Sequence, residues 1–156
     1  MNNGGYNLRD SLFIEGDTLI SGRRYLIRNG TYLGNPRRDL LFDSAMSIYT
    51  YPFRDILFTL DDEVEVTKSF GHGDNIIAVG TYSLESATTS VTVPAGQFEC
   101  FSYTGTIESV LPDYQHGTRY NSYLYSNEVG LVLMRTHFFS SPNNLEMRLV
   151  DYGANN

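Results

Sequence analysis

Three histidines and one cysteine are the residues whose chemistry would first indicate catalysis or metal binding. His72 and His116 fall in loops and His137 on an expected strand, without the H-E-x-x-H or C-x-x-C spacing that places two ligands beside one metal. Cys100 has no His or Asn arranged around it in sequence, so we expect a small buried hydrophobe and not a thiolate nucleophile. The sequence therefore predicts no metal and no cofactor.

The densest run of carboxylates, Asp61–Glu65, has the oxygen atoms of a calcium loop but not the glycine that its sharp turn requires. Alternation places Glu63 and Glu65 on one face of an expected strand and Val64 and Val66 on the other, which favours a solvated face. No G-x-S-x-G, Walker or dinucleotide-binding glycine motif occurs. We therefore expect a protein that is not an enzyme; a hydrolase acting through unpaired acids is the remote alternative.

Tyrosine is the residue type most suited to binding here, with twelve Tyr, nine Phe and no Trp in 156 residues. A tyrosine offers a large contact area and a polar hydroxyl at low entropic cost. The C-terminal half carries the best candidate surface, which would line a carbohydrate, peptide or subunit contact: Tyr114, Tyr120, Tyr123 and Tyr125. The alternative is that these rings are ordinary sheet aromatics packed on a core.

The elements that must position these side chains are strands. No segment holds helical spacing for more than two turns, whereas alternation over five to nine residues recurs between Gly, Pro, Asn and Asp. The pattern predicts an all-β, antiparallel sheet curled into a sandwich or partly closed barrel, with about 9–11 short strands and little or no helix. Phe98–Ile107 carries apolar groups on both faces, which predicts a central strand reached from Ser90–Val93 through a Pro-Ala-Gly turn.

Several glycines predict local geometry. Asn29-Gly30 between Arg23–Arg28 and Thr31–Leu33 is typical of a type I′ hairpin turn, because both turn residues tolerate a positive φ. Glu15–Asp17 is expected to form another turn. Gly80 is expected to mark a bulge in a later strand.

Length and charge limit the classes of partner. We expect one β domain over 11–152, a flexible segment over 1–10 and a polar tail over 153–156. No apolar run is long enough for a transmembrane span, and the polar start predicts no signal peptide in this chain. The net charge of −7 argues against nucleic acid and anionic membranes.

That charge is unevenly distributed along the chain. Residues 1–60 carry seven Arg and six acidic residues, a net charge of +1, and residues 61–156 carry four basic and twelve acidic residues, a net charge of −8. The asymmetry indicates either a device that orients a partner or a solvated acidic surface.

Three segments, Gly16–Tyr25, Val91–Phe101 and Val129–Val132, follow the patterns G-D-T-x-I-x-G-x-x-Y, V-x-V-P-A-G-x-F and V-G-L-V. Their order and spacing resemble secreted or cell-envelope domains of Bacteroidetes-like bacteria. Similar segments occur in domains of unknown function related to the fold of periplasmic lipoprotein carriers, and in proteins exported with a C-terminal sorting domain. This chain departs from the resemblance in having no Trp-containing first strand, which indicates a shortened chain or a first strand contributed from elsewhere.

The resemblance implies export, to the periplasm, the cell surface or the medium, and it carries no catalytic residues. We therefore expect a non-enzymatic secreted or envelope-associated β domain that serves protein–protein contact or assembly, with a protein partner or self-association through exposed strand edges. The alternative is a carrier or binding domain for a hydrophobic ligand, because the expected central strand is apolar on both faces.

Overall fold

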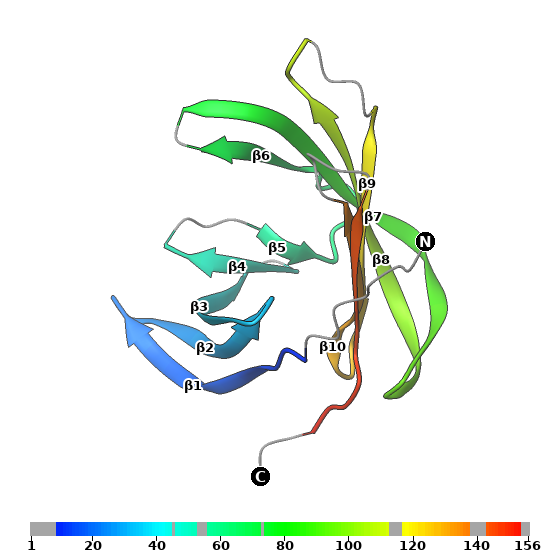
Figure 1. Ribbon diagram of the computed structural model, residues 1–156. Helices are drawn as coiled ribbons and strands as arrows, with labels where there is room; N and C mark the ends of the chain where they lie inside the picture. The colour runs from blue at the N-terminus through cyan, green and yellow to red at the C-terminus, as the bar shows by residue number, and fades with distance from the viewer. Residues whose placement is uncertain are drawn as a thin grey trace. The chain divides into compact units, whose positions relative to one another are not determined.

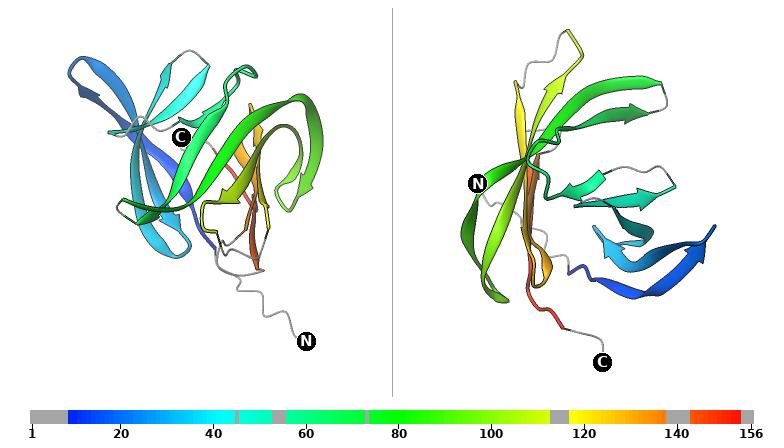
Figure 2. Two further views of the ribbon diagram at one scale, coloured as in Figure 1. Left: turned by 90° about the horizontal axis from the view of Figure 1, so that it is seen from above. Right: turned by 180° about the vertical axis from the view of Figure 1, so that it is seen from behind.

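The protein is built from β-strands (Figures 1 and 2). A computed structural model describes residues 9–44, 46–52, 56–72, 74–112, 117–137 and 143–153, which contain eleven strands and no helix. The strands are β1 (Leu12–Ile20), β2 (Arg23–Tyr32), β3 (Asn35–Ser44), β4 (Ser47–Tyr51), β5 (Ile56–Thr59), β6 (Val66–His72), β7 (Asn75–Val93), β8 (Gly96–Ser109), β9 (Arg119–Ser126), β10 (Gly130–His137) and β11 (Asn144–Arg148). Within these ranges no helix is long and apolar enough to span a membrane.

The strands form two antiparallel sheets, with the orders β1-β2-β3-β4-β5 and β11-β10-β9-β8-β7-β6. Each sheet ends in two edge strands, so neither closes into a barrel, and the predicted all-β antiparallel fold is confirmed. The contacts divide the chain into unit 1, residues 1–59, and unit 2, residues 60–156, and each contains one sheet. The single domain expected over 11–152 stays a prediction.

Unit 1 is a meander whose two-residue turns are not all where the sequence indicates. Ser21 and Gly22 connect β1 to β2 with φ angles of 51° and 80°, as a type I′ turn requires. The next turn is formed by Leu33 and Gly34, with φ angles of 52° and 74°. The hairpin predicted at Asn29-Gly30 is wrong, because β2 continues through both residues.

Two other features explain this turn position. The carboxylate of Asp10 accepts hydrogen bonds from the amides of Leu33, at 2.7 Å, and Gly34, at 2.9 Å, and so holds the turn two residues beyond Thr31. A Cβ atom on Gly30 would lie 1.8 Å from the carbonyl oxygen of Ser11. The glycine is therefore required by the close approach of the chain that leads into β1, and not by a turn.

The turn expected at Glu15–Asp17 is also wrong. β1 is continuous, and the register with β2 shifts by one residue between Ile14 and Gly16. Such an irregularity is a β-bulge, which leaves one residue unpaired and increases the local twist without ending the strand.

Aromatic side chains form the centre of unit 1. The ring of Tyr25 packs edge-on against those of Phe42 and Tyr51, with centroid separations of 5.4 and 5.0 Å, and Phe42 stacks on Tyr49 at 5.1 Å. The guanidinium of Arg23 lies 4.5 Å from the Phe42 centroid. Because Tyr49 is half-buried and Tyr51 is exposed, this cluster is open on one side.

Unit 2 is organised by the long hairpin of β7 and β8, drawn as two long twisted arrows in Figures 1 and 2. β7 extends for 19 residues and joins two segments that the sequence separates, with an irregularity between Leu84 and Thr88. Gly80 pairs in register with Lys68 and Ile107, so the predicted bulge there is wrong. A Cβ on Gly80 would meet ring atoms of Tyr82 and of the β6 phenylalanine at 2.8 Å, and this crowding explains the glycine.

β8 lies between β7 and β9, so the predicted central strand is confirmed. One face of β8 is buried along the first half of the strand, and the opposite face is buried along the second half. Phe98 and Cys100 are buried on one face of the first half, whereas Tyr103 and Ile107 are buried on the other face of the second half. The strand therefore belongs to two clusters.

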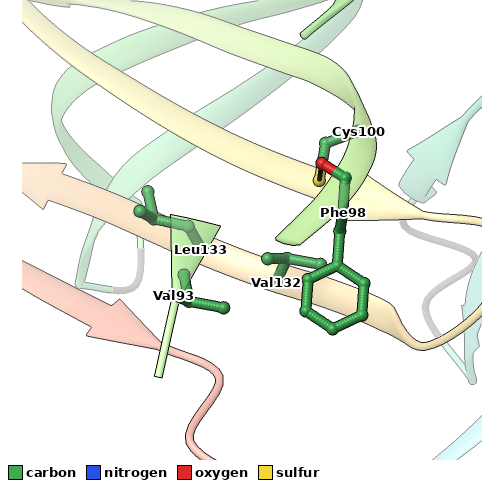
Figure 3. Packing of buried hydrophobic residues seen from close by; sticks show 5 residues of the cluster. All are labelled: Val93, Phe98, Cys100, Val132 and Leu133. Carbon is green, nitrogen blue, oxygen red and sulfur yellow. Dashed lines mark hydrogen bonds between the residues drawn. The ribbon is translucent and has the colours of Figure 1, made fainter. Parts of the chain in front are cut away.

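The first of these clusters is apolar, and Figure 3 shows its five buried members: Val93, Phe98, Cys100, Val132 and Leu133. They come from β7 and β8, which are paired, and from β10, which lies on the other side of β9. The Leu149 backbone closes the cluster, because its N–H donates to the Val132 carbonyl at 2.8 Å and its C=O accepts from the Ala95 amide at 3.2 Å.

The segment before β6 is not the strand that the alternation predicts. β6 begins at Val66, and residues 61–65 precede it. The Asp61 carboxylate accepts the amide of Glu63 at 3.1 Å, and the Asp61 carbonyl accepts the amide of Val64 at 3.3 Å. These local bonds form a turn, which satisfies backbone groups that a strand would pair across a ladder.

Candidate interaction surfaces

The predicted tyrosine surface is divided by the structure. Tyr114 lies outside the described residues. Tyr120 is on β9 with 64% of its surface exposed. Tyr123 and Tyr125 are half-buried on the same strand, and alternation places them on the face opposite Tyr120. One sheet face thus brings together Tyr123 and Tyr125 but not Tyr120.

Tyr123 belongs to a buried network centred on Tyr82. The Tyr82 ring, which is 1% exposed, stacks on Tyr103 with centroids 5.9 Å apart and lies 6.1 Å from the Tyr123 centroid. The amide nitrogen of Asn121 donates to the Tyr82 hydroxyl at 3.2 Å, and its amide oxygen accepts the backbone N–H of His137 at 2.9 Å. This network connects β7, β8, β9 and β10, so its polar atoms stabilise the packing of these strands.

The Tyr82 ring lies where Gly105 leaves room for it. A Cβ on Gly105 would be 2.2 Å from a ring carbon of Tyr82. The Nζ atom of Lys68 lies 5.1 Å from the Tyr82 centroid, within cation–π range. Sequence reasoning missed Tyr82 and Asn121, because the network depends on which residues face each other across strands and no local pattern encodes that.

Burial makes Tyr82, Tyr103 and Cys100 of unit 2 poor acids. It raises the pKa of Tyr103 to about 12, with a smaller contribution from neighbouring Tyr82, and it also raises the pKa of Tyr82. Burial raises the pKa of the Cys100 thiol, and the negative charge of Glu99 raises it further. These groups therefore stay protonated near neutral pH, and the thiol lacks the lowered pKa that activates a nucleophilic cysteine.

Of the three histidines, only His137 has a side chain that the structure describes. The His137 ring contacts the Tyr120 carbonyl through Nδ1, while His116 lies outside the described ranges. Over those ranges no three His, Cys, Asp or Glu side chains lie close enough together to hold a metal ion.

A shallow depression lies at the β2–β3 turn of unit 1, lined by Tyr32, Leu33, Asn35, Pro36, Arg37 and Asp39. Its charges are paired. The Asp39 carboxylate accepts from Arg28 at 2.7 Å and from Arg37 at 2.8 Å. Desolvation acts to raise the pKa of Asp39, but the hydrogen bonds and charges of Arg37 and Arg28 outweigh it and hold the pKa below its ordinary value.

The four sheet edges differ in how well they are protected against pairing with another chain. β5 has only four residues, β6 carries Lys68, and β11 carries an ion-paired triad in which Glu146 bridges Arg135 and Arg148. Short length and charged side chains are the usual means of blocking an edge. β1 has nine residues, and its first part is uncharged.

The open edge of β1 begins with three apolar residues, Leu12, Phe13 and Ile14, which are 40%, 44% and 45% exposed. Leu19 further along is 73% exposed. Among the residues described, β1 is hydrogen-bonded to β2 alone. An exposed apolar stretch on an edge strand, here the three residues before Glu15, is a template for an added strand. The residues expected from the sequence to bind, the tyrosines of β9, therefore differ from those of the most accessible edge.

Comparison with protein-family models, with curated proteins and with solved structures finds no match for this chain.

Proposed function

We propose that this chain is a non-enzymatic, secreted or envelope-associated β domain that makes protein–protein contacts through an exposed sheet edge. The single observation that carries the proposal is the β1 edge, where Leu12, Phe13 and Ile14 are exposed in sequence on a strand with one hydrogen-bonded neighbour. Monomeric proteins seldom leave such an edge uncovered, because it pairs readily with other chains.

The chemistry of the described side chains supports a binding role over a catalytic one. Burial raises the pKa of the Tyr82 and Tyr103 hydroxyls and of the Cys100 thiol, and so holds these three groups in their protonated forms. The secreted location is supported by the three sequence segments that resemble exported envelope domains. A hydrolase acting through acids that the sequence does not pair stays the remote alternative, and a broad screen with ester and glycoside substrates tests it.

Hydrogen exchange of the full chain, measured at several protein concentrations together with sedimentation velocity, tests the contact function. We expect amides of β1 to become slower to exchange as concentration rises or when the natural partner is added. A strict monomer whose β1 amides exchange rapidly under every condition would contradict the proposal. Protection that rises in β6 or β11 alone would place the contact on a different edge.

Carriage of a hydrophobic ligand is the second candidate, favoured by β8, whose two faces carry buried apolar residues in succession. Native mass spectrometry of protein purified from cells tests it. A bound adduct that organic extraction removes would support carriage, and a spectrum of the bare chain mass would contradict it.

A further inference from the structure

We infer that the partner of the β1 edge is a second copy of this chain, paired antiparallel about a twofold axis at Phe13. The two five-stranded sheets would then form one continuous sheet. This inference rests on the proposed contact function, since it names the partner and the register for the same edge.

The backbone of β1 has its hydrogen-bonding groups in the right phase for this pairing. The Ser11 carbonyl accepts the amide of Thr31 at 2.8 Å, so Ser11 is directed toward β2. Antiparallel strands alternate between residues that bond to the neighbour and residues that do not. Phe13 is therefore also directed toward β2, and the N–H and C=O groups of Leu12 and Ile14 point outward.

An axis at Phe13 uses those outward groups. It places Leu12 opposite Ile14 of the second copy, and each such pair exchanges two hydrogen bonds. Phe13 then faces its own equivalent in a non-hydrogen-bonded pair, where side chains approach most closely. The stretch is therefore self-complementary: in a second, antiparallel copy, the outward N–H and C=O groups find hydrogen-bond partners and each apolar side chain faces another apolar side chain.

Charge distinguishes this register from one centred on Gly16. An axis at Gly16 would place Glu15 opposite Asp17 of the second copy, and directly opposed like charges destabilise a sheet. The Phe13 register places Glu15 opposite Ser11 and brings only uncharged residues to the axis. Two copies with a net charge of −7 each are thus joined where neither carries charge.

The structure also explains where the pairing would end. The bulge between Ile14 and Gly16 shifts the register of β1 and increases its twist immediately after the apolar stretch. On the other side, two contacts hold the residues that lead into β1. The Asp10 carboxylate accepts a hydrogen bond from the β2–β3 turn, and the Ser11 amide donates to the Thr31 hydroxyl at 3.2 Å. The pairing segment is therefore short and held in place before a partner arrives.

Disulfide trapping of the full chain tests the register. In Phe13→Cys, the two cysteines of a non-hydrogen-bonded pair would have Cα atoms about 4.5 Å apart, within the range that a disulfide spans. We expect mild oxidation to give a covalent dimer. Leu19→Cys, on the same strand and more exposed, is the matched control and should stay monomeric on a non-reducing gel. Cys100 is fully buried and does not compete.

A charge exchange at the axis provides an independent measurement. Phe13→Glu and Phe13→Lys should each weaken self-association at least about tenfold in sedimentation velocity, because each variant opposes like charges at the axis. An equimolar mixture of the two should recover the dimer, since the charges are then opposite. Circular dichroism of each variant checks that the exposed substitution leaves the fold intact.

The outcomes separate this inference from the function on which it rests. A dimer that both charge variants leave intact, or that Leu19→Cys traps as well as Phe13→Cys, overturns the β1 register but leaves the contact function standing. A wild-type monomer whose β1 becomes protected only with another protein overturns self-pairing and supports a different partner. A monomer with no protection of β1 overturns both.

Discussion

The two units of this protein bury their side chains to different degrees. Among the described residues, unit 1 has four buried hydrophobic residues, Tyr25, Leu41, Phe42 and Phe58, whereas unit 2 has eleven. Unit 1 adds ion pairs and an aromatic cluster open on one side, and unit 2 adds an apolar cluster and a hydrogen-bonded tyrosine network.

The same difference extends to the edges. The β11 edge of unit 2 carries ion-paired charges, and the β1 edge of unit 1 begins with exposed apolar residues. A sheet that buries little within its own unit retains apolar surface for other contacts, because a single sheet has two faces and needs a second layer. The comparison indicates that unit 2 contains more buried apolar residues, whereas unit 1 leaves the apolar start of β1 exposed.

The largest expected effect tests the tyrosine network of unit 2. Gly105→Ala would place a methyl group 2.2 Å from the Tyr82 ring, so the ring or β8 must move. We expect the free energy of unfolding to fall by about 4 kcal/mol or more, measured by denaturant titration with tyrosine fluorescence. Gly153→Ala, with no atom within 4 Å of the added methyl, is the control and should change stability by less than about 0.5 kcal/mol.

A matched pair of phenylalanines compares the two units directly. Phe98 in unit 2 and Phe42 in unit 1 are both 5% exposed. We expect Phe98→Ala to cost about 3–4 kcal/mol, because Phe98 packs in a cluster with four other buried apolar residues. Phe42→Ala should cost about 2–3 kcal/mol, because the exposed Tyr51 can move into the space. A larger loss at Phe42, measured by thermal denaturation, would contradict the comparison.

Acidity should weaken unit 1 through Asp39. Its pKa is lowered in the folded state, so the carboxylate contributes stability above the unfolded pKa of about 3.9, and that stability is lost as pH falls through the folded value. Asp39→Asn should cost about 1–2 kcal/mol at pH 7, because Arg28 is half-buried beside it, and should flatten the pH dependence below about pH 4. Exposed Asp43→Asn is the control, and an equal effect there would show that general charge is responsible.

The smallest effect is expected at the β11 edge. Glu146→Gln removes the carboxylate shared by Arg135 and Arg148, which are 55% and 53% exposed. Exposed ion pairs contribute little, so we expect a loss of about 0.5 kcal/mol or less in thermal denaturation. If the triad protects the β11 edge from pairing, the variant should also self-associate more at high concentration. An unchanged sedimentation profile would show that another feature protects this edge.

The fold class was predictable from residue periodicity because strands place alternate side chains on opposite faces wherever they occur. The hairpin of β7 and β8 is an example: Pro94 and Gly96 end one strand and begin the next, as the sequence indicates. The turn at Asn29-Gly30 was not predictable in the same way. A glycine that faces a close backbone approach has the same local pattern as one in a turn, and only the position of Ser11 distinguishes them.

The candidate site was less predictable than the fold. The sequence favoured the tyrosines of β9, but a tyrosine on a strand serves a core or a surface according to what lies opposite it. Tyr123 faces Tyr103 on β8 and packs near Tyr82, whereas Tyr120 points to the other face and stays exposed.

By itself, the sequence determined that this protein is made of antiparallel strands, because alternation and turn residues act over a few neighbours and need no distant partner. Tertiary structure alone decided the order of the strands in two sheets, the partners of Tyr82 and the identity of the edges. These depend on contacts between residues far apart in the chain. The apolar stretch of β1 has the sequence pattern of a buried strand, and it is an exposed sheet edge only because no described strand lies beyond it.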